Sequence, residues 1–150
     1  MRIKIKKLHP DAVIPSKGHN SDFCYDCIAT SAEEIAPNVW KYGLGFAIEI
    51  DRTNAIYDVK DLNLSIDIRP RSSVWKTGMI LSNCEGTIDE GYRGEVCAIF
   101  YHVMPNMPRY KVGDRIIQIK LGDAEALSFE SVEELSDTER GSGGFGSTGK

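Results

Sequence analysis

The fold is decided by the stretch Asn83-Cys-Glu-Gly-Thr-Ile-Asp-Glu-Gly-Tyr-Arg-Gly-Glu-Val96, which places an acidic, glycine-containing turn between two short extended segments. Turn residues between extended runs are typical of a β-hairpin. This hairpin would bring a carboxylate, Asp89, and an aromatic ring, Tyr92, into one bend. A stiff hairpin can hold a catalytic base and a ligand ring in fixed relation. The simpler interpretation is an ordinary turn, because Asp and Gly are common turn residues.

Short runs of alternating or continuous apolar residues on both sides of this hairpin predict a largely β chain. Besides the hairpin, we expect strands over the following residues: 2–7, 23–30, 44–50, 62–68, 96–103 and 115–121. Stretches 31–38 and 124–134 predict no more than a helical turn each, and the polar stretch 51–61 predicts a long hairpin or a surface loop. Seven or more short strands without a convincing helix predict an all-β sandwich or barrel.

Length and charge limit the classes of partner. The chain has 150 residues, which fits one domain, and its 18 basic and 22 acidic residues give a net charge of −4. The basic run 4–7 contains an apolar residue, as on a half-exposed strand, so we do not expect direct binding of nucleic acid. No apolar run approaches the roughly 20 residues of a membrane helix, and no signal peptide opens the chain. We therefore expect a soluble, cytoplasmic protein.

The four cysteines, Cys24, Cys27, Cys84 and Cys97, raise the question of a metal site. The spacing of Cys24 and Cys27 matches half a zinc site. The other two lie too far apart in the sequence for a second such pair, and positions three apart in a strand face opposite sides. We expect neither zinc nor disulfides and predict buried free thiols, because intracellular cysteines usually stay reduced.

Proline ends the strand 62–68 at Arg69-Pro-Arg-Ser-Ser73, where Ser72 and Ser73 can begin a short helical turn. Hydroxyls, an arginine and newly exposed backbone N–H groups meet at this corner and suit a phosphate. The alternative is a plain N-cap beside a surface arginine. Asp26, inside the apolar run 23–30, is either on the solvent face or kept for a ligand or an ion.

The composition changes at Arg140-Gly-Ser-Gly-Gly-Phe-Gly-Ser-Thr-Gly-Lys150, so we divide the chain into a domain, 1–139, and an arm, 140–150. Residues 144–150 match the first positions of a phosphate-binding P-loop. That motif needs a following helix, and none follows here, so we do not expect a P-loop. The glycines, the hydroxyls and the lone Phe145 suit an arm that closes over a phosphorylated, aromatic ligand. The alternative is a flexible linker.

Five separated segments together resemble the trimeric dUTPase family (deoxyuridine 5′-triphosphate nucleotidohydrolases). In the order of the family they are Tyr25-Asp-Cys-Ile-Ala29, Pro70-Arg-Ser-Ser73, Gly86-Thr-Ile-Asp-x-x-Tyr-Arg-Gly94, Gly113-Asp-Arg-Ile-Ile-Gln118 and Arg140-Gly-x-Gly-Gly-Phe-Gly-Ser-Thr-Gly149. The resemblance implies a distorted β-barrel of the jelly-roll type that forms a homotrimer, with active sites shared between subunits. It also implies hydrolysis of dUTP to dUMP and pyrophosphate, with Mg²⁺ on the triphosphate.

Carried over by position, the resemblance makes Asp89 the catalytic residue, which would orient and activate the water that attacks the α-phosphorus. Tyr92 would lie against the sugar and exclude a 2′-hydroxyl. The uracil edge would be recognised by the following residues: Asn83, Gly86, Thr87 and Ile88.

The resemblance also assigns the phosphates to Arg71, Ser72 and Ser73, with help from Gln118. Asp26 would organise the magnesium through a coordinated water, because Mg²⁺ commonly keeps water between itself and protein carboxylates. The arm would close over the base and the γ-phosphate with the following residues: Arg140, Phe145, Gly146 and Ser147. The chain departs from the family pattern at residues 23–25, at Cys27 and Ser73, and in a longer loop before Leu62.

Two other interpretations stand beside this one. A dCTP deaminase resembles the same segments but needs a general-base glutamate in the strand after the hairpin, and residues 96–100 contain no carboxylate. A non-catalytic, nucleotide-binding regulatory trimer would use the same pocket. The presence of Asp89 together with Tyr92 and Phe145 argues against a loss of catalysis.

Overall fold

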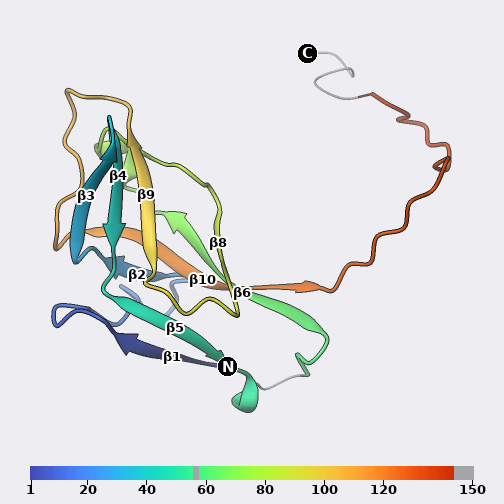
Figure 1. Cartoon of the computed structure of the whole chain (residues 1–150), viewed down its shortest axis with the longest axis horizontal. Coiled ribbons are helices and arrows are strands. Elements are labelled where there is room, and N and C mark those ends of the chain that lie inside the picture. The colour runs from blue at the N-terminus through green and yellow to red at the C-terminus, as the bar shows by residue number, and fades with distance from the viewer. Residues whose placement is uncertain (56–57, 144–150) are drawn as a thin grey trace.

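The computed structural model describes residues 1–55 and 58–143, and its regular secondary structure is almost entirely β-strand (Figure 1). The strands are β1 (Arg2–Lys7), β2 (Tyr25–Ile28), β3 (Ser31–Ala36), β4 (Val39–Gly43), β5 (Phe46–Asp51), β6 (Leu62–Pro70), β7 (Met79–Leu81), β8 (Gly86–Asp89), β9 (Cys97–His102) and β10 (Arg115–Glu125). Two single 3₁₀ turns, η1 (Arg52–Asn54) and η2 (Val74–Lys76), follow β5 and β6.

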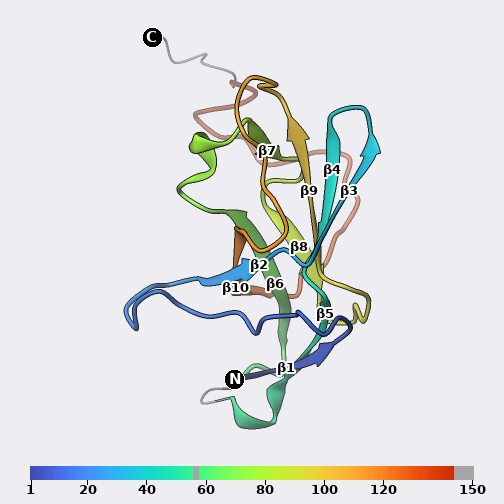
Figure 2. The same cartoon turned by 90° about the vertical axis from the view of Figure 1, so that its left-hand side faces the viewer.

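The strands form three antiparallel sheets, in the orders β1-β5, β2-β10-β6-β8 and β3-β4-β9-β7. Figure 2 shows β3, β4 and β9 side by side, with β1 and β5 at the opposite end of the domain. Among the described residues no strand pairing closes the three sheets into one continuous barrel. The all-β prediction is confirmed, and the open sheets agree with a distorted jelly-roll.

The core lies between the sheets and is built from apolar side chains of most of the strands. In β6, Leu64, Ile66 and Ile68 are buried, as their alternation with polar residues predicts. Tyr42 of β4 packs edge-on against Phe100 of β9, with ring centroids 5.9 Å apart. The Tyr42 hydroxyl donates a hydrogen bond of 2.9 Å to the backbone carbonyl of Tyr110, and its burial raises its pKa to about 12. The Tyr42 ring therefore packs in the core while its hydroxyl has a hydrogen-bond partner.

The opposite face of the sheet β2-β10-β6-β8 is polar, although part of it is buried. Asp67 is only 8% exposed, accepts a hydrogen bond of 2.8 Å from the Ser65 hydroxyl and is ion-paired with Lys120. Burial acts to raise the pKa of Asp67, but the bonds from Lys120 and Ser65 outweigh it, and the net pKa is lowered. Gly122, which pairs with Ser65, leaves room for this carboxylate, because a Cβ there would lie 2.5 Å from Asp67 Oδ2.

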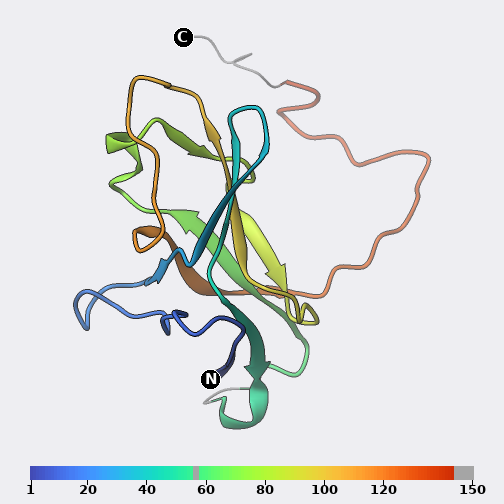
Figure 3. The same ribbon diagram turned by 60° about the vertical axis from the view of Figure 1, so that its left-hand side comes forward.

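The structure corrects the prediction for 31–38. The stretch 31–38 is not a helical turn: β3 and β4 form a hairpin in which Asn38 adopts a positive φ of 61°. All six residues of β3 are exposed, so it carries no apolar alternation. Its extended conformation comes from backbone pairing with β4, which sequence periodicity does not reveal. Figure 3 shows this hairpin reaching beyond the rest of its sheet.

The predicted hairpin at 83–96 is also corrected. Its first arm, β8, pairs with β6, and the strand after it, β9, pairs with β4 and β7, so the two arms do not pair with each other. The turn itself is present, because the backbone N–H of Tyr92 donates to the Asp89 carbonyl at 3.0 Å. The segment therefore crosses from one sheet to another. β10 continues to Glu125, beyond the predicted end at 121, and β4 and β7 are strands that the sequence patterns did not predict.

The prediction of buried thiols is correct for only one of the four free cysteines. Cys27 is buried, Cys24 and Cys97 are half-buried, and Cys84 is exposed. Burial raises the pKa of the Cys27 thiol to about 12, with a smaller contribution from the charge of Asp26. Among the described residues no helix is long and apolar enough to cross a membrane. The cytoplasmic location stays a prediction.

Thiol labelling tests this arrangement. A thiolate is the reactive form of cysteine, so a thiol with a raised pKa, buried in the core, reacts slowly. In the native protein we expect a maleimide to modify Cys84 first and Cys27 last, with sites located by mass spectrometry. Labelling in denaturant is the control, where all four should react alike. Rapid modification of native Cys27 would contradict the packing described here.

Candidate active site

One group of candidate residues gathers on β8 and the turn after it. Asp89 is the last residue of β8, is exposed, and pairs with Ser65 of β6. Its carboxylate makes no hydrogen bond or ion pair with another described residue, which leaves both oxygens available. Beside it lies a pocket of about 200 Å³, lined by Asn83, Thr87, Ile88, Asp89, Tyr92, Glu95, Val96 and Cys97.

The ring of Tyr92 forms one wall of this pocket and is held in place from two sides. Its hydroxyl donates to the Glu95 carbonyl at 3.1 Å. A Cβ on Gly94 would lie 2.5 Å from the Tyr92 Cζ atom, so the ring covers Gly94 and tolerates no side chain there. The Glu95 carboxylate accepts a hydrogen bond of 2.8 Å from the Gly45 N–H, which ties this segment to the start of β5. The ring therefore has a defined position although it is 47% exposed.

Gly86 lies against Asn83, another residue of the pocket lining. It is buried at the start of β8, and a Cβ there would lie 3.0 Å from Asn83 Nδ2 and 3.4 Å from the Ile68 Cβ. Asn83 can approach the backbone of β8 closely because Gly86 has no side chain. This places a side-chain amide next to the backbone N–H and C=O groups of an edge strand, the kind of groups that recognise a flat, polar ring.

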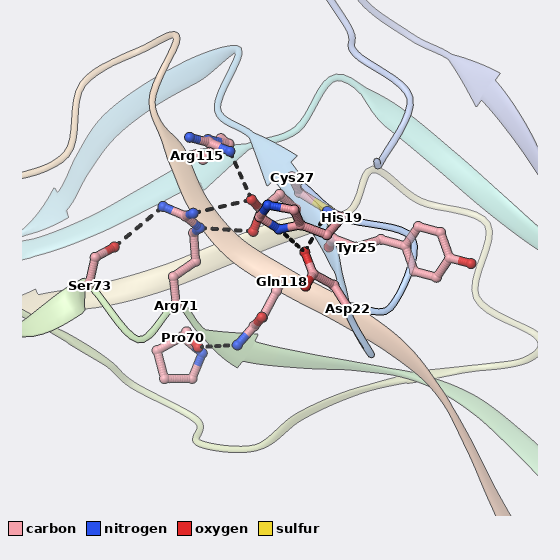
Figure 4. A network of polar contacts seen from close by, with 10 residues as sticks. His19, Asp22, Tyr25, Cys27, Pro70, Arg71, Ser73, Arg115 and Gln118 are labelled. Atoms are coloured by element: carbon pink, nitrogen blue, oxygen red, sulfur yellow. Dashed lines mark hydrogen bonds and ion pairs between the residues drawn. The ribbon is translucent and has the colours of Figure 1, made fainter. Parts of the chain in front are cut away.

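A second group gathers at the other end of the same sheet (Figure 4). The Arg71 guanidinium donates to both oxygens of Asp26, at 2.8 and 3.2 Å, and to the Ser73 hydroxyl at 3.3 Å. Arg115 donates to the same carboxylate at 3.2 Å. Gln118 donates to the Pro70 carbonyl at 3.0 Å, directly before Arg71. Strand pairing places Gln118 opposite Asp26, so these side chains share the polar face of the sheet.

The surroundings of this second group are basic. Ser73 precedes η2, as predicted, and its side chain makes no capping hydrogen bond. Ser72 is exposed. The corner opens into a pocket of about 480 Å³, lined by Arg71, Ser73, Lys76, Thr77, Pro108, Arg109, Tyr110, Lys111, Asp114 and Arg115. The lining contains five cationic side chains and one carboxylate, that of Asp114, although the whole chain has a net charge of −4. Arginine guanidinium groups and lysines suit a chain of phosphates.

Asp26 is the candidate for a contact with magnesium. Its side chain is 17% exposed and lies between two guanidinium groups. In the part of the chain that the structure describes, no three His, Cys, Asp or Glu side chains gather into a metal cage. Mg²⁺ is often held by one or two carboxylates, substrate phosphates and water. A single carboxylate beside this basic corner suits a magnesium ion that arrives on a phosphate chain.

The two groups do not meet within one chain. Asp89 pairs with Ser65, whereas Arg71 follows the end of β6, six residues further along. At about 3.3 Å per residue this separates them by roughly 20 Å. Arg140 lies apart from both, exposed in the long stretch after β10, and donates to the Gly143 carbonyl at 2.9 Å. The expected arm residues Phe145, Gly146 and Ser147 lie outside the described residues.

Sequence reasoning overlooked two residues. Arg115 binds the Asp26 carboxylate together with Arg71. Its position in the sequence, at the start of the strand that carries Gln118, could have identified it. Glu95 anchors the segment beneath Tyr92 through a backbone N–H of another sheet. No local pattern marks such a contact, because its two partners are 50 residues apart.

Known proteins resemble this chain over its whole length. A family model described as dUTPase matches residues 12–149. Proteins named deoxyuridine 5′-triphosphate nucleotidohydrolase from Nautilia profundicola and Crocosphaera subtropica are 37% and 38% identical, over 100% and 99% of both chains.

Among solved structures, a mutant dUTPase of Staphylococcus bacteriophage 80alpha with dUpNHpp has a TM-score of 0.79 at 22% identity, over 99% of both chains. A mutant dUTPase of phage phi11, described with a structural Mg(II) ion, has a TM-score of 0.69 at 17% identity, over 91% of this chain and 100% of that one. These structures share the fold. Together with the family model and the full-length relatives, they lead to one conclusion: this chain belongs to the dUTPase family.

Proposed function

We propose that this protein hydrolyses dUTP to dUMP and pyrophosphate in active sites assembled between the subunits of a homotrimer. The observation that carries the proposal is the exposed Asp89 carboxylate beside a pocket walled by Tyr92, in a chain that also has an arginine–serine corner. The reaction would limit uracil in DNA and supply dUMP for thymidylate synthesis.

Asp89 is the proposed general base. Its unpaired, exposed carboxylate can accept a hydrogen bond from a water molecule and direct it at the α-phosphorus. The P–O bond to the pyrophosphate then breaks as the bond from the water oxygen forms, and the carboxylate takes the proton. In-line geometry supplies much of the rate in phosphoryl transfer, so the position of Asp89 matters as much as its basicity.

The phosphates are assigned to Arg71, Ser72, Ser73 and Gln118. Gln118 holds the Pro70 carbonyl and so fixes the backbone from which Arg71 extends. When it is bound, Mg²⁺ would neutralise charge on the triphosphate oxygens. Asp26 would contact that ion through a water molecule and would, in addition, hold the Arg71 guanidinium in the orientation seen here.

The base and the sugar are assigned to the pocket beside β8. Asn83 and the backbone of residues 86–88 would pair with the uracil edge, and cytosine would leave these groups mispaired. Tyr92 would lie against the deoxyribose, where a 2′-hydroxyl would collide with a ring that Gly94 and Glu95 hold in place. Arg140, Phe145, Gly146 and Ser147 are assigned to an arm that closes over the base and the γ-phosphate.

The separation of the two groups supports sites shared between subunits. Roughly 20 Å along an extended strand is too far for one triphosphate to contact both Asp89 and Arg71 of the same chain at close range. Neither of the two pockets that Asp89 lines, of about 200 and 430 Å³, includes a residue of the Arg71 corner. A second copy would supply the missing phosphate corner, and a closed trimer repeats that junction three times.

The stretch after β10 supports contact between copies independently. It extends away from the domain (Figure 1) and leaves Phe129 and Leu135 91% and 87% exposed. An apolar groove of about 360 Å³ lies between β1 and β10, where Ile3 and Ile5 form one wall. Among the described strands, β1 pairs only with β5, so its other edge is open. Its lysines complement the acidic residues of 125–139, which supports the docking of this stretch on a neighbouring copy.

The deaminase alternative is not favoured. β9 reads Cys-Ala-Ile-Phe-Tyr-His and offers no carboxylate for proton transfer at the amine of cytosine. The nearest upstream carboxylate, Glu95, is engaged by the Gly45 N–H. No feature of the described residues favours a purely regulatory role.

Replacing Asp89 by Asn tests the assignment of the base. The amide keeps the shape of the side chain but cannot take the proton, so we expect kcat for dUTP to fall by about 10²-fold or more while dUTP binding persists. Pyrophosphate release and calorimetric binding measure the two effects. Wild-type assays with dCTP, dTTP and UTP are the controls. Near-normal turnover by Asp89→Asn, or ammonia release from dCTP, would contradict the proposal.

Mixing subunits tests whether sites are shared. Asp89→Asn and Arg71→Ala should each be inactive alone. If each site takes Asp89 from one subunit and Arg71 from another, mixed trimers made by refolding equal amounts together should recover about a quarter of wild-type activity, since a quarter of the junctions are intact. The same variants refolded separately and then combined are the control. No recovery in trimers shown to be mixed would place both residues in one chain's site.

Replacing Gly94 by Ala tests the sugar gate. The added Cβ would displace the Tyr92 ring, so we expect the preference for dUTP over UTP, measured as a ratio of kcat/KM values, to fall about tenfold or more. Gly91→Ala is the matched control, because a Cβ at Gly91 meets nothing within 4 Å. An unchanged ratio in Gly94→Ala would separate Tyr92 from sugar recognition.

A further inference from the structure

The loop between β5 and β6 contacts the turn that carries Asp89 through one side chain. Arg52, at the start of η1, donates from Nε to Glu90 Oε1 at 2.7 Å and from Nη2 to Glu90 Oε2 at 2.6 Å. Two parallel bonds between a guanidinium and a carboxylate fix both distance and orientation. Glu90 is the residue directly after Asp89, so this pair joins a loop with no assigned role to the proposed catalytic turn.

Arg52 is itself held by the far end of its own loop. Its Nη1 donates to the Val59 carbonyl, and its Nη2 donates to the Leu62 carbonyl at 3.0 Å. Val59 is 4% exposed and anchors the returning chain. At the near end, Asp51 accepts hydrogen bonds from the backbone N–H and the hydroxyl of Thr53, at 3.0 and 2.6 Å. Two backbone carbonyls therefore hold the guanidinium in addition to Glu90.

The turn has little else to hold it. β8 has four residues and pairs with β6 alone, and the last pair is Ser65 with Asp89. After that pair, the bond from the Tyr92 N–H to the Asp89 carbonyl and those from Arg93 to the Glu90 and Tyr92 carbonyls all lie inside the turn. Among the described residues, only one side chain of the turn 89–93 forms hydrogen bonds to a residue outside the segment 83–96. This side chain is Glu90, which binds Arg52.

The charges at this contact favour its persistence at neutral pH. The hydrogen bonds from Arg52 hold the pKa of the Glu90 carboxyl below its ordinary value. A carboxyl whose pKa is lowered by folding adds stability above its unfolded pKa and loses it as the pH falls through the folded value. The pair therefore remains ionised over the range in which Asp89 would act as a base.

We propose that Arg52 is a positioning residue for the reaction, which fixes, through Glu90, the turn that presents Asp89 to the attacking water. The proposal rests on the assignment of Asp89 as the base, and it gives the long loop 51–61 a role in catalysis. Phosphoryl transfer depends on alignment, and a displacement of about 1 Å can lower a rate by about 10²-fold. An exposed carboxylate on a short edge strand is sensitive to such a displacement.

The test replaces Arg52 by Gln in the full-length protein. We expect kcat for dUTP to fall about tenfold or more while KM changes less than about twofold, because the uracil contacts lie upstream of the turn. Lys60→Gln is the matched control. It removes the same charge from the same loop, and the exposed Lys60 side chain makes no ion pair among the described residues, so it should leave kcat unchanged.

A double-mutant cycle identifies the contact itself. Glu90→Gln should lower kcat as Arg52→Gln does, and the double variant should be no worse than Arg52→Gln, because the two bonds between Arg52 and Glu90 are lost in all three. Arg52→Lys, which keeps the charge but not the two parallel bonds, should fall between wild type and Arg52→Gln. Additive losses would mean that the two residues act separately and would overturn the proposal.

Amide hydrogen exchange gives a readout that does not need turnover. The Tyr92 N–H should exchange faster in Arg52→Gln and in Glu90→Gln than in wild type or Lys60→Gln, because its partner is the Asp89 carbonyl. Unchanged exchange, or unchanged kcat in both variants, would overturn the role of Arg52. Full turnover in Asp89→Asn would instead overturn the proposed base, so the two failures are distinguishable.

Discussion

The rise of an extended strand sets the layout of this molecule. β6 pairs with β10 on one side and β8 on the other, so all residues on its polar face have distances fixed by the sheet. Ser65 stands opposite Asp89 near one end, and Pro70 leads into Arg71 at the other. Because a paired strand cannot shorten, the groups proposed for base and phosphates stay roughly 20 Å apart in one chain. This constraint is the reason why we propose active sites shared between subunits.

Electrostatics act at both ends of that strand. At one end a single carboxylate, Asp26, orients two arginines in a basic corner, so a chain with net negative charge still presents a local site for anions. At the other end Asp89 has no cation of its own, and the nearest ion pair belongs to its neighbour Glu90. The Asp89 carboxylate is therefore available to bind a water molecule, while Glu90 connects the turn to Arg52.

Local patterns in the sequence predicted β1 and β6 well, because each alternates apolar and polar residues on a half-buried sheet. They missed β3, whose six residues are all exposed and whose conformation comes from its partner. The hairpin at 83–96 was predicted from its turn chemistry, which is local and correct. Its strand pairing was wrong, because the choice between β6 and β9 as the partner of β8 depends on distant residues.

The sequence by itself determined the family, through five separated segments in order, and the chemical types at each proposed position: a carboxylate at 89, an arginine and serines at 71–73, an amide at 118. These properties belong to single residues and short spacings. Only the tertiary structure decided that the two groups lie at opposite ends of one strand, that Tyr92 rests on Gly94, and that Arg52 reaches Glu90. The partners in the last contact are 38 residues apart, and chain folding alone brings such side chains together.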